Sequence, residues 1–134
     1  MSTPIAKAGM KASRRFLIVD DNNDFVDMLR VLLELNGHQV ETAGDGIAGL
    51  EAAIRMEPDV VVLDVGLPKL NGYEVCRRIR EQQLAMQPMI IGATGWAQLL
   101  DKKLSQFAGF DAQLVKPFGY EELEILVDSA PARP

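Results

Sequence analysis

Charged and hydroxyl side chains stand directly after four apolar segments of this 134-residue sequence. Asp20 and Asp21 follow one segment and Asp64 follows another, while Thr94 and Lys116 come after two more. Three carboxylates held close together repel one another, which raises the pKa of at least one of them unless a cation joins them. Mg²⁺ prefers oxygen ligands and keeps bound waters, so it is the cation that this set of residues predicts.

Carboxylates, Mg²⁺, a lysine and a hydroxyl together suit the binding of a phosphoryl group. The metal ion and the Lys116 ammonium would neutralise phosphoryl oxygens, and the Thr94 hydroxyl would donate to one of them. A carboxylate can also attack phosphorus itself and become an aspartyl-phosphate. A lone acid after a strand is usually a helix cap or a turn residue, and this simpler explanation stands for any single position. It gives no reason for all of them to meet at one place.

The segments that carry these residues alternate between strand and helix patterns. Apolar or alternating runs typical of strands cover residues 16–19, 38–43, 60–63, 89–91 and 112–115. Asn22 or Asn23 would cap the first helix, and Gly37 would end it in a left-handed conformation. Apolar residues at helical spacing lie between and after the strands: Phe25, Met28, Leu29, Leu32 and Leu33; Ile47, Leu50 and Ile54; Val75, Cys76 and Ile79; Leu100, Leu104 and Phe107; Leu123, Leu126 and Val127.

Five strands that alternate with five helices predict an α/β fold, a doubly wound parallel sheet with helices on both faces, because parallel strands need helical crossovers. Ligands bind such sheets beyond the carboxyl ends of the strands. The polar residues at the strand ends should therefore converge on one edge of the sheet.

Composition narrows the class of protein. The net charge of −5 argues against broad attraction to nucleic acid or to an anionic membrane. Cys76, the single cysteine, excludes an intramolecular disulfide and is expected in the core. No apolar run approaches the ~18 residues of a membrane span, and the basic N-terminus lacks the apolar stretch of a signal peptide. We expect one cytoplasmic domain at residues 15–128, with a disordered lead-in at 1–14 and a tail at 129–134.

Four motifs, in this order and at these intervals, resemble the receiver domain of two-component response regulators. They are FLIVDDN at 16–22, VVLDVGLP at 61–68 with NGYE at 71–74, IGATG at 91–95, and LVKPF at 114–118. The segments DVGLP at 64–68 and GFDAQLVKP at 109–117 are most similar to receivers of hybrid sensor kinases. The resemblance implies a flavodoxin-like (CheY-like) fold with five parallel strands in the order 2-1-3-4-5.

The resemblance also implies a role for each acidic residue. Asp64 would accept a phosphoryl group from a kinase phosphohistidine and would be a Mg²⁺ ligand. Asp21 would bind the ion directly, and Asp20 through water. The main-chain carbonyl of Gly66 would be a further ligand.

The remaining roles concern the switch and its partners. Thr94 would bond one phosphoryl oxygen and reorient, Lys116 would pair with another, and Lys116–Pro117 would be a cis peptide. The output face would be the fourth helix, fifth strand and fifth helix, residues 98–127. The expected partners are a sensor histidine kinase or phosphotransfer protein, and a downstream protein on that face. About six residues follow the last helix, which leaves no room for a DNA-binding helix-turn-helix or an effector enzyme, so we expect output by protein contact, either stand-alone or as part of a hybrid kinase. We also expect a monomer or weak dimer, without direct nucleic-acid contact or membrane insertion.

Three positions depart from the best-known receivers. Gln113 stands where many carry an aromatic ring that moves with the threonine, so an amide that exchanges hydrogen-bond partners would replace that ring. Gly66 leaves space beside the phosphoryl group. Trp96, two places after Thr94, would cover that space and slow phosphoryl loss, or would instead anchor a partner or pack on the fourth helix.

Two other functions stay open beside the leading interpretation, which is a phosphoacceptor signalling module and not an enzyme. A Mg²⁺-dependent phosphohydrolase with an aspartate nucleophile usually carries an acid two places further on, where Gly66 stands, and a cap insertion over its substrate. A degenerate receiver that acts only as a binding module would have no need of the complete set of acids, threonine and lysine.

Overall fold

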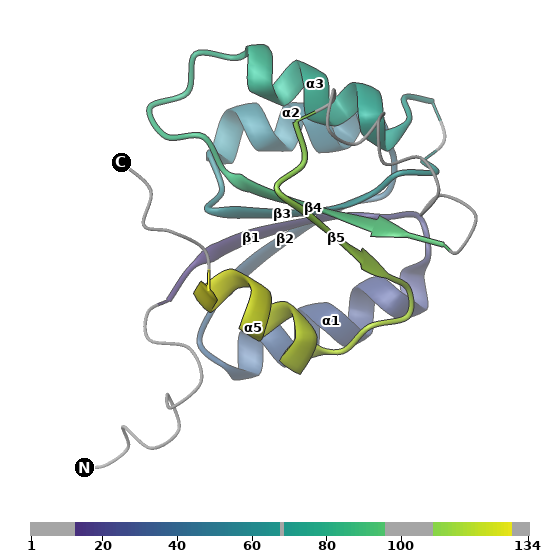
Figure 1. Ribbon diagram of the computed structural model, residues 1–134, viewed down its shortest axis with the longest axis vertical. Coiled ribbons are helices and arrows are strands. Elements are labelled where there is room, and N and C mark those ends of the chain that lie inside the picture. Colours follow the sequence, from purple (N-terminus) through teal and green to yellow (C-terminus); the bar gives the residue numbers. More distant parts are fainter. Residues whose placement is uncertain (1–12, 68, 96–108, 130–134) are drawn as a thin grey trace.

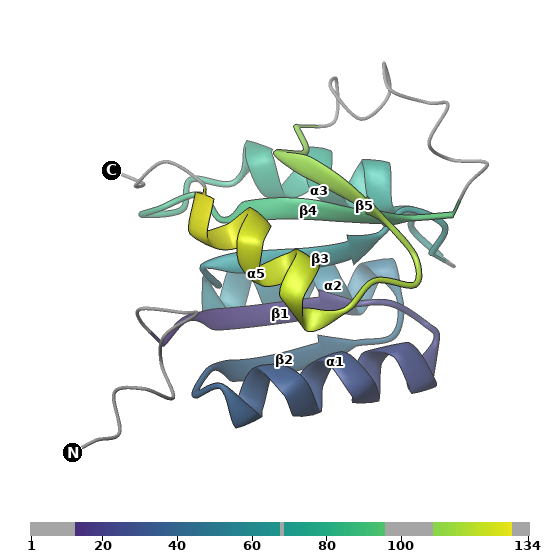
Figure 2. The same cartoon turned by 60° about the horizontal axis from the view of Figure 1, so that its bottom comes forward.

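The computed structural model describes residues 13–67, 69–95 and 109–129, which form a parallel sheet in the order β2-β1-β3-β4-β5. Every pairing in this sheet is parallel, and β2 and β5 are its edge strands (Figure 2). The predicted doubly wound fold and its strand order are confirmed. The strands are β1 (Arg15–Val19), β2 (Gln39–Ala43), β3 (Val60–Asp64), β4 (Met89–Thr94) and β5 (Ala112–Val115).

Helices cover both faces of the sheet (Figure 1). Within the described residues, α1 (Asn23–Leu35) and α5 (Tyr120–Ser129) lie on one face, and α2 (Gly46–Met56) and α3 (Gly72–Glu81) lie on the other. Successive side chains of a strand point to opposite faces, so Phe16 and Ile18 of β1 enter the core under α1 and α5, while Leu17 and Val19 enter the core under α2 and α3. The predicted fourth helix, with Leu100, Leu104 and Phe107, lies outside the described residues.

Short polar side chains fix where the helices begin. Asn22, Asp45 and Asn71 each accept a hydrogen bond from the backbone N–H three residues further on, at 2.8–3.1 Å. Such bonds satisfy donors that a helix leaves unpaired in its first turn. Asn22, and not Asn23, is therefore the cap of α1, and Gly37 follows that helix with a left-handed φ of 87° as predicted.

The buried face of α2 was predicted wrongly. Ile47 and Ile54 of the expected apolar stripe are 48% and 40% exposed. The helix approaches the sheet so closely that a Cβ on Gly49 would lie 2.5 Å from Cγ1 of Val19. Only small residues fit along most of this contact, and the face that α2 buries is Gly46, Gly49, Ala52, Ala53 and Met56.

The buried face of α1 is also turned slightly from the prediction. Met28 is exposed, whereas Val26, which lies outside the expected stripe, is buried beside Phe25, Leu29 and Leu33. The helix carries more apolar residues than the sheet and α5 cover, so counting apolar positions overstated the width of the buried stripe.

Arg80, near the end of α3, joins that helix to β4 and to the residues before β5. Its guanidinium donates to the carbonyls of Pro88 at 2.7 Å and Gly109 at 3.0 Å, and to Asp111 Oδ2 at 2.8 Å. The same carboxylate oxygen accepts a hydrogen bond from the N–H of Ile90 at 2.7 Å. One side chain thus fixes three segments at the amino end of β4.

The start of β1 and the end of α5 meet at the amino edge of the sheet. Arg14 Nη1 lies 3.3 Å from Asp128 Oδ1, and the Arg14 N–H donates to Nδ1 of the buried His38 at 3.0 Å. Among the described helices, none combines the length and the apolar character needed to cross a bilayer.

Candidate functional site

The three acidic residues singled out in the sequence meet at the carboxyl edge of the sheet. Asp20 and Asp21 come directly after β1, and Asp64 is the last residue of β3. These strands are neighbours in parallel register, with Val19 opposite Leu63, so the residues that follow lie side by side. One carboxylate oxygen from each of the three lies within 4.8 Å of the others. The predicted convergence of the acids is confirmed.

Two of these carboxylates are buried and are held in the same way. Asp20 is 2% exposed and Asp64 is 9% exposed, whereas Asp21 is open to solvent. Oδ1 of Asp20 accepts the N–H of Asn22, and Oδ1 of Asp64 accepts the N–H of Gly66, both at 2.9 Å. The backbone therefore fixes one oxygen of each buried carboxylate and leaves Oδ2 for the centre of the site.

Lys116 occupies that centre. Its Nζ lies 2.9 Å from Asp20 Oδ2 and 3.6 Å from Asp64 Oδ2. The ammonium also lies 5.3 Å from the centroid of the Phe25 ring, within the range of a cation–π contact. The Lys116–Pro117 peptide is cis, as the resemblance implied.

The electrostatics of the site favour an added cation. Burial, as the largest influence, raises the pKa of Asp64; the charges of Asp20 and Asp21 also raise it, and the Gly66 N–H and Lys116 do not offset this. Burial works to lower the pKa of Lys116, but the hydrogen bond and charge of Asp20, with the charge of Asp64, leave that pKa raised. Three carboxylates and one ammonium carry a formal charge of −2, which a divalent ion bound through oxygen would neutralise.

Thr94 lies at the same edge but turns toward β5. It is fully buried at the end of β4, and its hydroxyl donates to the Leu114 carbonyl at 3.5 Å. Its register partner is Val115, the residue before Lys116. The structure thus brings Thr94 and Lys116 together through β5.

Gly66 lies in the connection between β3 and α3, two residues after Asp64. Its backbone is exposed, while Val65 and Leu67 on either side are buried. The N–H of Gly72 donates to the Val65 carbonyl at 3.1 Å and closes this connection on itself. Main-chain atoms of Gly66 therefore face the solvent beside the carboxylates.

Residues that the prediction did not assign to the site also shape it. The Asn22 N–H orients Asp20, although the sequence suggested only a helix cap. Phe25 was expected in the core, and its ring also lies beside Lys116. Gly72 belongs to the motif NGYE at 71–74 and was given no role in the site, yet a Cβ at this position would lie 2.3 Å from the Asp64 carbonyl oxygen. The Asn71-Gly72 pair was the available signal for this close approach.

The other singled-out residues lie away from the carboxylates or outside the described residues. Gln113 lies on the edge strand β5, half-buried, and pairs in register with Gly92 of β4. Cys76 is buried in the core, as expected, and burial raises the pKa of its thiol to about 12. Trp96 lies outside the described residues, as does most of the expected output face before residue 109.

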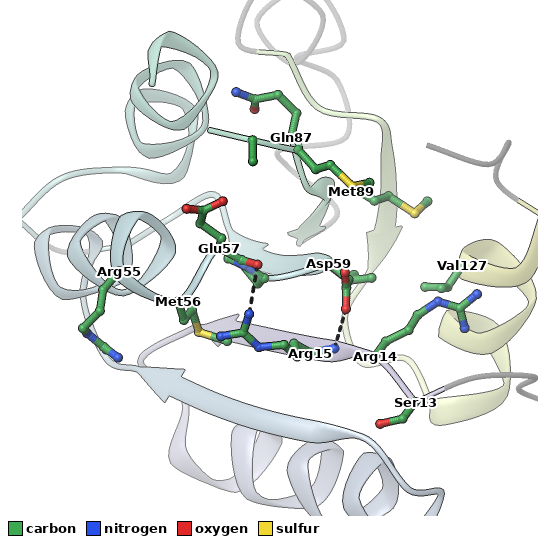
Figure 3. Close-up of a pocket in the computed structure, with 14 residues that line it drawn as sticks. Ser13, Arg14, Arg15, Arg55, Met56, Glu57, Asp59, Gln87, Met89 and Val127 are labelled. Carbon is green, nitrogen blue, oxygen red and sulfur yellow. Dashed lines mark hydrogen bonds between the residues drawn. The ribbon is translucent and has the colours of Figure 1, made fainter. Parts of the chain in front are cut away.

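A separate hollow of about 700 Å³ opens at the opposite, amino edge of the sheet (Figure 3). Two of its charged side chains bind main-chain atoms of its own walls: the backbone N–H of Arg15 donates to the Asp59 carboxylate at 2.8 Å, and the Arg15 guanidinium donates to the main-chain carbonyl of Glu57 at 3.5 Å (Figure 3). The candidate site is therefore the acidic edge and not this hollow.

Comparison with known proteins was made by sequence and by structure. Residues 16–128 match the family model described as the response regulator receiver domain. The chain is 37% identical over 109 residues to the DNA-binding dual master transcriptional regulator RpaA of Synechocystis, covering 81% of this chain and 45% of that protein. It is 40% identical over 115 residues to the alkaline phosphatase synthesis transcriptional regulatory protein PhoP of Bacillus subtilis, covering 86% and 47%. The chain spans about half the length of these curated relatives.

Solved structures give the same result. The receiver domain of the sensor histidine kinase PA1611 from Pseudomonas aeruginosa, solved with a magnesium ion in its active site cleft, superimposes with a TM-score of 0.77 and 31% identity, over 87% of this chain and 96% of that one. The chemotaxis response regulator CheY4 of Vibrio cholerae superimposes with a TM-score of 0.75 and 30% identity, over 86% and 95%.

Proposed function

This chain belongs to the response regulator receiver domain family, the signalling modules of two-component systems, and on that premise we propose that Asp64 accepts a phosphoryl group from the phosphohistidine of a sensor histidine kinase or phosphotransfer protein. The observation that carries the proposal is the position of Asp64. Its carboxylate ends a buried strand, lies within 4.8 Å of two other acids, and faces the ammonium of Lys116 at 3.6 Å.

The proposed transfer moves one phosphoryl group between two residues. An Asp64 carboxylate oxygen attacks phosphorus, the P–N bond to the donor imidazole breaks, and the ring nitrogen keeps the electron pair. Oδ1 of Asp64 is held by the Gly66 N–H, so Oδ2, on the side of Lys116, is the oxygen presented to the donor. Lys116 then exchanges Asp20 for a phosphoryl oxygen, and the Thr94 hydroxyl bonds another.

The donor set fits Mg²⁺. Asp20, Asp21 and Asp64 would hold the ion, Asp20 through water, and the Gly66 carbonyl would be a further oxygen ligand. When bound, the ion supplies positive charge that neutralises phosphoryl oxygens during transfer. Support comes from the clustering of the carboxylate oxygens and from the formal charge of −2 in the site.

We also propose an output through β5 and α5, together with residues 98–108 before them. Thr94 donates to β5, and Lys116 follows that strand directly, so a change of partner at either residue acts on the same strand. The expected occupant of this face is a downstream protein. The name of RpaA describes DNA binding, but the match covers 45% of that protein, and for this chain we propose protein contact as a cytoplasmic monomer or weak dimer. Residues 15–128 would form the domain, 1–14 its lead-in and 129–134 its tail.

Phosphorylation in vitro tests the proposal directly. The protein is incubated with Mg²⁺ and a small phosphodonor such as acetyl phosphate, and intact mass spectrometry follows the gain of one phosphoryl group. Wild type should gain a hydroxylamine-labile adduct, and Asp64→Asn should not. Asp27→Asn, a change of an exposed acid on α1, is the matched control and should react like wild type. If wild type gained no adduct with any phosphodonor, the chain would be interpreted as a module that only binds partners. Turnover of phosphate esters would instead favour a phosphohydrolase.

A further inference from the structure

The first residue of α2 touches the backbone of the connection between β3 and α3, which we call the acceptor loop (described residues 65–67 and 69–71). A Cβ on Gly46 would lie 1.8 Å from the carbonyl oxygen of Leu70 and 2.7 Å from its carbonyl carbon. Ordinary contacts of a Cβ begin near 3.4 Å. Any side chain at position 46 would therefore force Leu70 or the start of α2 to move by more than 1 Å.

Part of the acceptor loop has a strained backbone and therefore needs support from the residues around it. Lys69 has a φ of 69°, a left-handed conformation that side chains other than glycine rarely adopt. Such a conformation persists when the surrounding structure holds it in place. The Nζ of Lys69 lies 3.5 Å from Oδ2 of Asp45, the residue that caps α2 and precedes Gly46. The start of α2 thus holds the loop at two consecutive positions.

The loop in turn sets the orientation of Asp64. The Gly66 N–H binds Asp64 Oδ1 at 2.9 Å, and the Gly72 N–H binds the Val65 carbonyl at 3.1 Å. A Cβ on Gly72 would lie 2.3 Å from the Asp64 carbonyl oxygen, so the far end of the loop packs directly against the end of β3. A displacement at Leu70 therefore acts on the same short connection that holds Gly66 and the carboxylate that it orients.

We propose that Gly46 is a positioning residue of the site: by leaving no atom between α2 and Leu70, it fixes the acceptor loop in the place where Asp64 and the Gly66 carbonyl can serve one cation. Gly46 touches neither the cation nor a phosphoryl group and acts only through the loop. The consequence for Mg²⁺ rests on the proposed function, whereas the placement of the loop does not.

The test is Gly46→Ala, studied with two readouts. Without metal, the backbone amide signals of Val65, Gly66, Leu67 and Leu70 in a two-dimensional ¹⁵N–¹H spectrum should shift, and the Gly72 amide should exchange faster with solvent. In a Mg²⁺ titration, the apparent Kd should weaken by about tenfold, the lower end of what the loss of support around a metal ligand causes.

Two other glycines of the same region are matched controls. Gly44→Ala adds a Cβ into open space and should behave like wild type in both readouts. Gly49→Ala collides with Val19 in the core, so it should lower the melting temperature and leave the loop amides unchanged. If Gly46→Ala does not fold, Asp45→Asn takes its place: asparagine keeps the helix cap but removes the ion pair to Lys69, and the loop amides should again shift.

The inference is overturned if the loop amides of Gly46→Ala stay at their wild-type positions, or if Gly49→Ala shifts the same amides equally. A wild-type protein that neither binds Mg²⁺ nor accepts a phosphoryl group would overturn the proposed function instead. The metal-free spectra would still decide whether Gly46 places the loop.

Discussion

Lys116 donates a hydrogen bond from Nζ to Oδ2 of Asp20 at 2.9 Å, across 96 positions of the chain. The Asp20 side chain is 1% exposed and that of Lys116 is 22% exposed, so water screens this pair only weakly. In the metal-free protein the ammonium is therefore the counter-charge of the buried acids. A cation that binds the same oxygens has to share them with Lys116.

Removal of the lysine should destabilise the metal-free protein and tighten its binding of Mg²⁺. Lys116→Met leaves Asp20 buried without its ion pair, and loss of one partner of such a pair costs about 3 kcal/mol of unfolding free energy. The formal charge of the site falls from −2 to −3, so Kd for Mg²⁺ should drop several-fold in isothermal titration. Lys116→Arg keeps the charge and should stay near wild type. Unchanged or weaker binding by Lys116→Met would contradict the competition between ammonium and metal.

Mg²⁺ itself should stabilise the wild-type fold. At a concentration tenfold above Kd, a ligand that binds only the folded state adds about 1.4 kcal/mol, which for a domain of this size raises Tm by about 5 °C. Thermal melts with Mg²⁺ and with a chelator measure the difference. Asp21→Asn removes one of the three carboxylates and should shrink the shift, while Asp27→Asn on the exposed side of α1 should retain it. If Mg²⁺ raised the Tm of Asp21→Asn as much as that of wild type, Asp21 would not be a ligand of the metal.

The raised pKa of Asp64 gives this residue its own contribution to the pH dependence of stability. Because the folded state holds this proton more tightly than the unfolded state, the contribution of Asp64 to stability falls as pH rises from below its ordinary value of 3.8 through the raised folded pKa. Above that pKa the ionised carboxylate is a net penalty. In the absence of metal, Asp64→Asn should therefore be more stable than wild type at pH 7, by an amount on the order of 1 kcal/mol.

Urea unfolding over a range of pH tests this sign. The difference in unfolding free energy between Asp64→Asn and wild type should vanish toward pH ~3, because asparagine and the protonated aspartic acid are both neutral there. Asp27→Asn serves as the control for the removal of a surface carboxylate. A variant that is less stable than wild type at pH 7 would show that the Gly66 and Lys116 contacts outweigh burial.

Arg80 should matter for folding far more than its neighbour Arg77. Arg80→Ala removes the hydrogen bonds to Pro88, Gly109 and Asp111, and the loss should lower the unfolding free energy by about 2–3 kcal/mol. Among the described residues Arg77 pairs with Glu74 and Glu81 of its own helix at the protein surface, so Arg77→Ala should cost about 0.5 kcal/mol. Denaturant titrations of the two variants compare them directly. Equal losses would mean that the contacts of Arg80 between segments add little.

The face that α2 buries can be tested at two adjacent residues. Ala53 is fully buried, and Ala53→Leu should overpack the contact with the sheet at a cost of about 1–3 kcal/mol. Ile54 lies on the outer side, so Ile54→Gln should change stability by less than about 0.5 kcal/mol. Thermal melts compare the two variants. If Ile54→Gln lowered the melting temperature more than Ala53→Leu, the buried face of α2 would be the apolar stripe predicted from the sequence.

The sequence was sufficient where a local pattern determines structure. Runs such as 16–19 and 60–63 identified buried strands, and parallel pairing then brings the residues after them to one edge, so Asp20, Asp64 and Lys116 could be grouped without coordinates. The motif 91–95 was harder, because Gly92 interrupts the apolar run of residues 89–91, so the strand was expected to end before Gly92 and Thr94. Their pairing with β3 and β5 nevertheless extends β4 to Thr94.

Contacts between distant segments could not be predicted in the same way. The hydrophobic pattern of α2 takes account only of apolar side chains, but the distance of this helix from the sheet is set by Gly49, which has no side chain beyond a hydrogen atom. The contact of Phe25 with Lys116, and that of Arg80 with Asp111, join positions whose approach depends on the whole fold. No local signal in one partner indicates the other.

The ion pair between Arg14 and Asp128, with Nη1 and Oδ1 3.3 Å apart, joins the start of β1 to the end of α5 at the edge away from the acids. Both of these positions therefore lie opposite the surface that a phosphate donor approaches. Domains of this geometry tolerate circular permutation and insertion into unrelated proteins. A short linker across Arg14 and Asp128, with new ends opened elsewhere, would yield a permuted chain with its acidic edge intact, ready for use as a cassette in engineered signalling proteins.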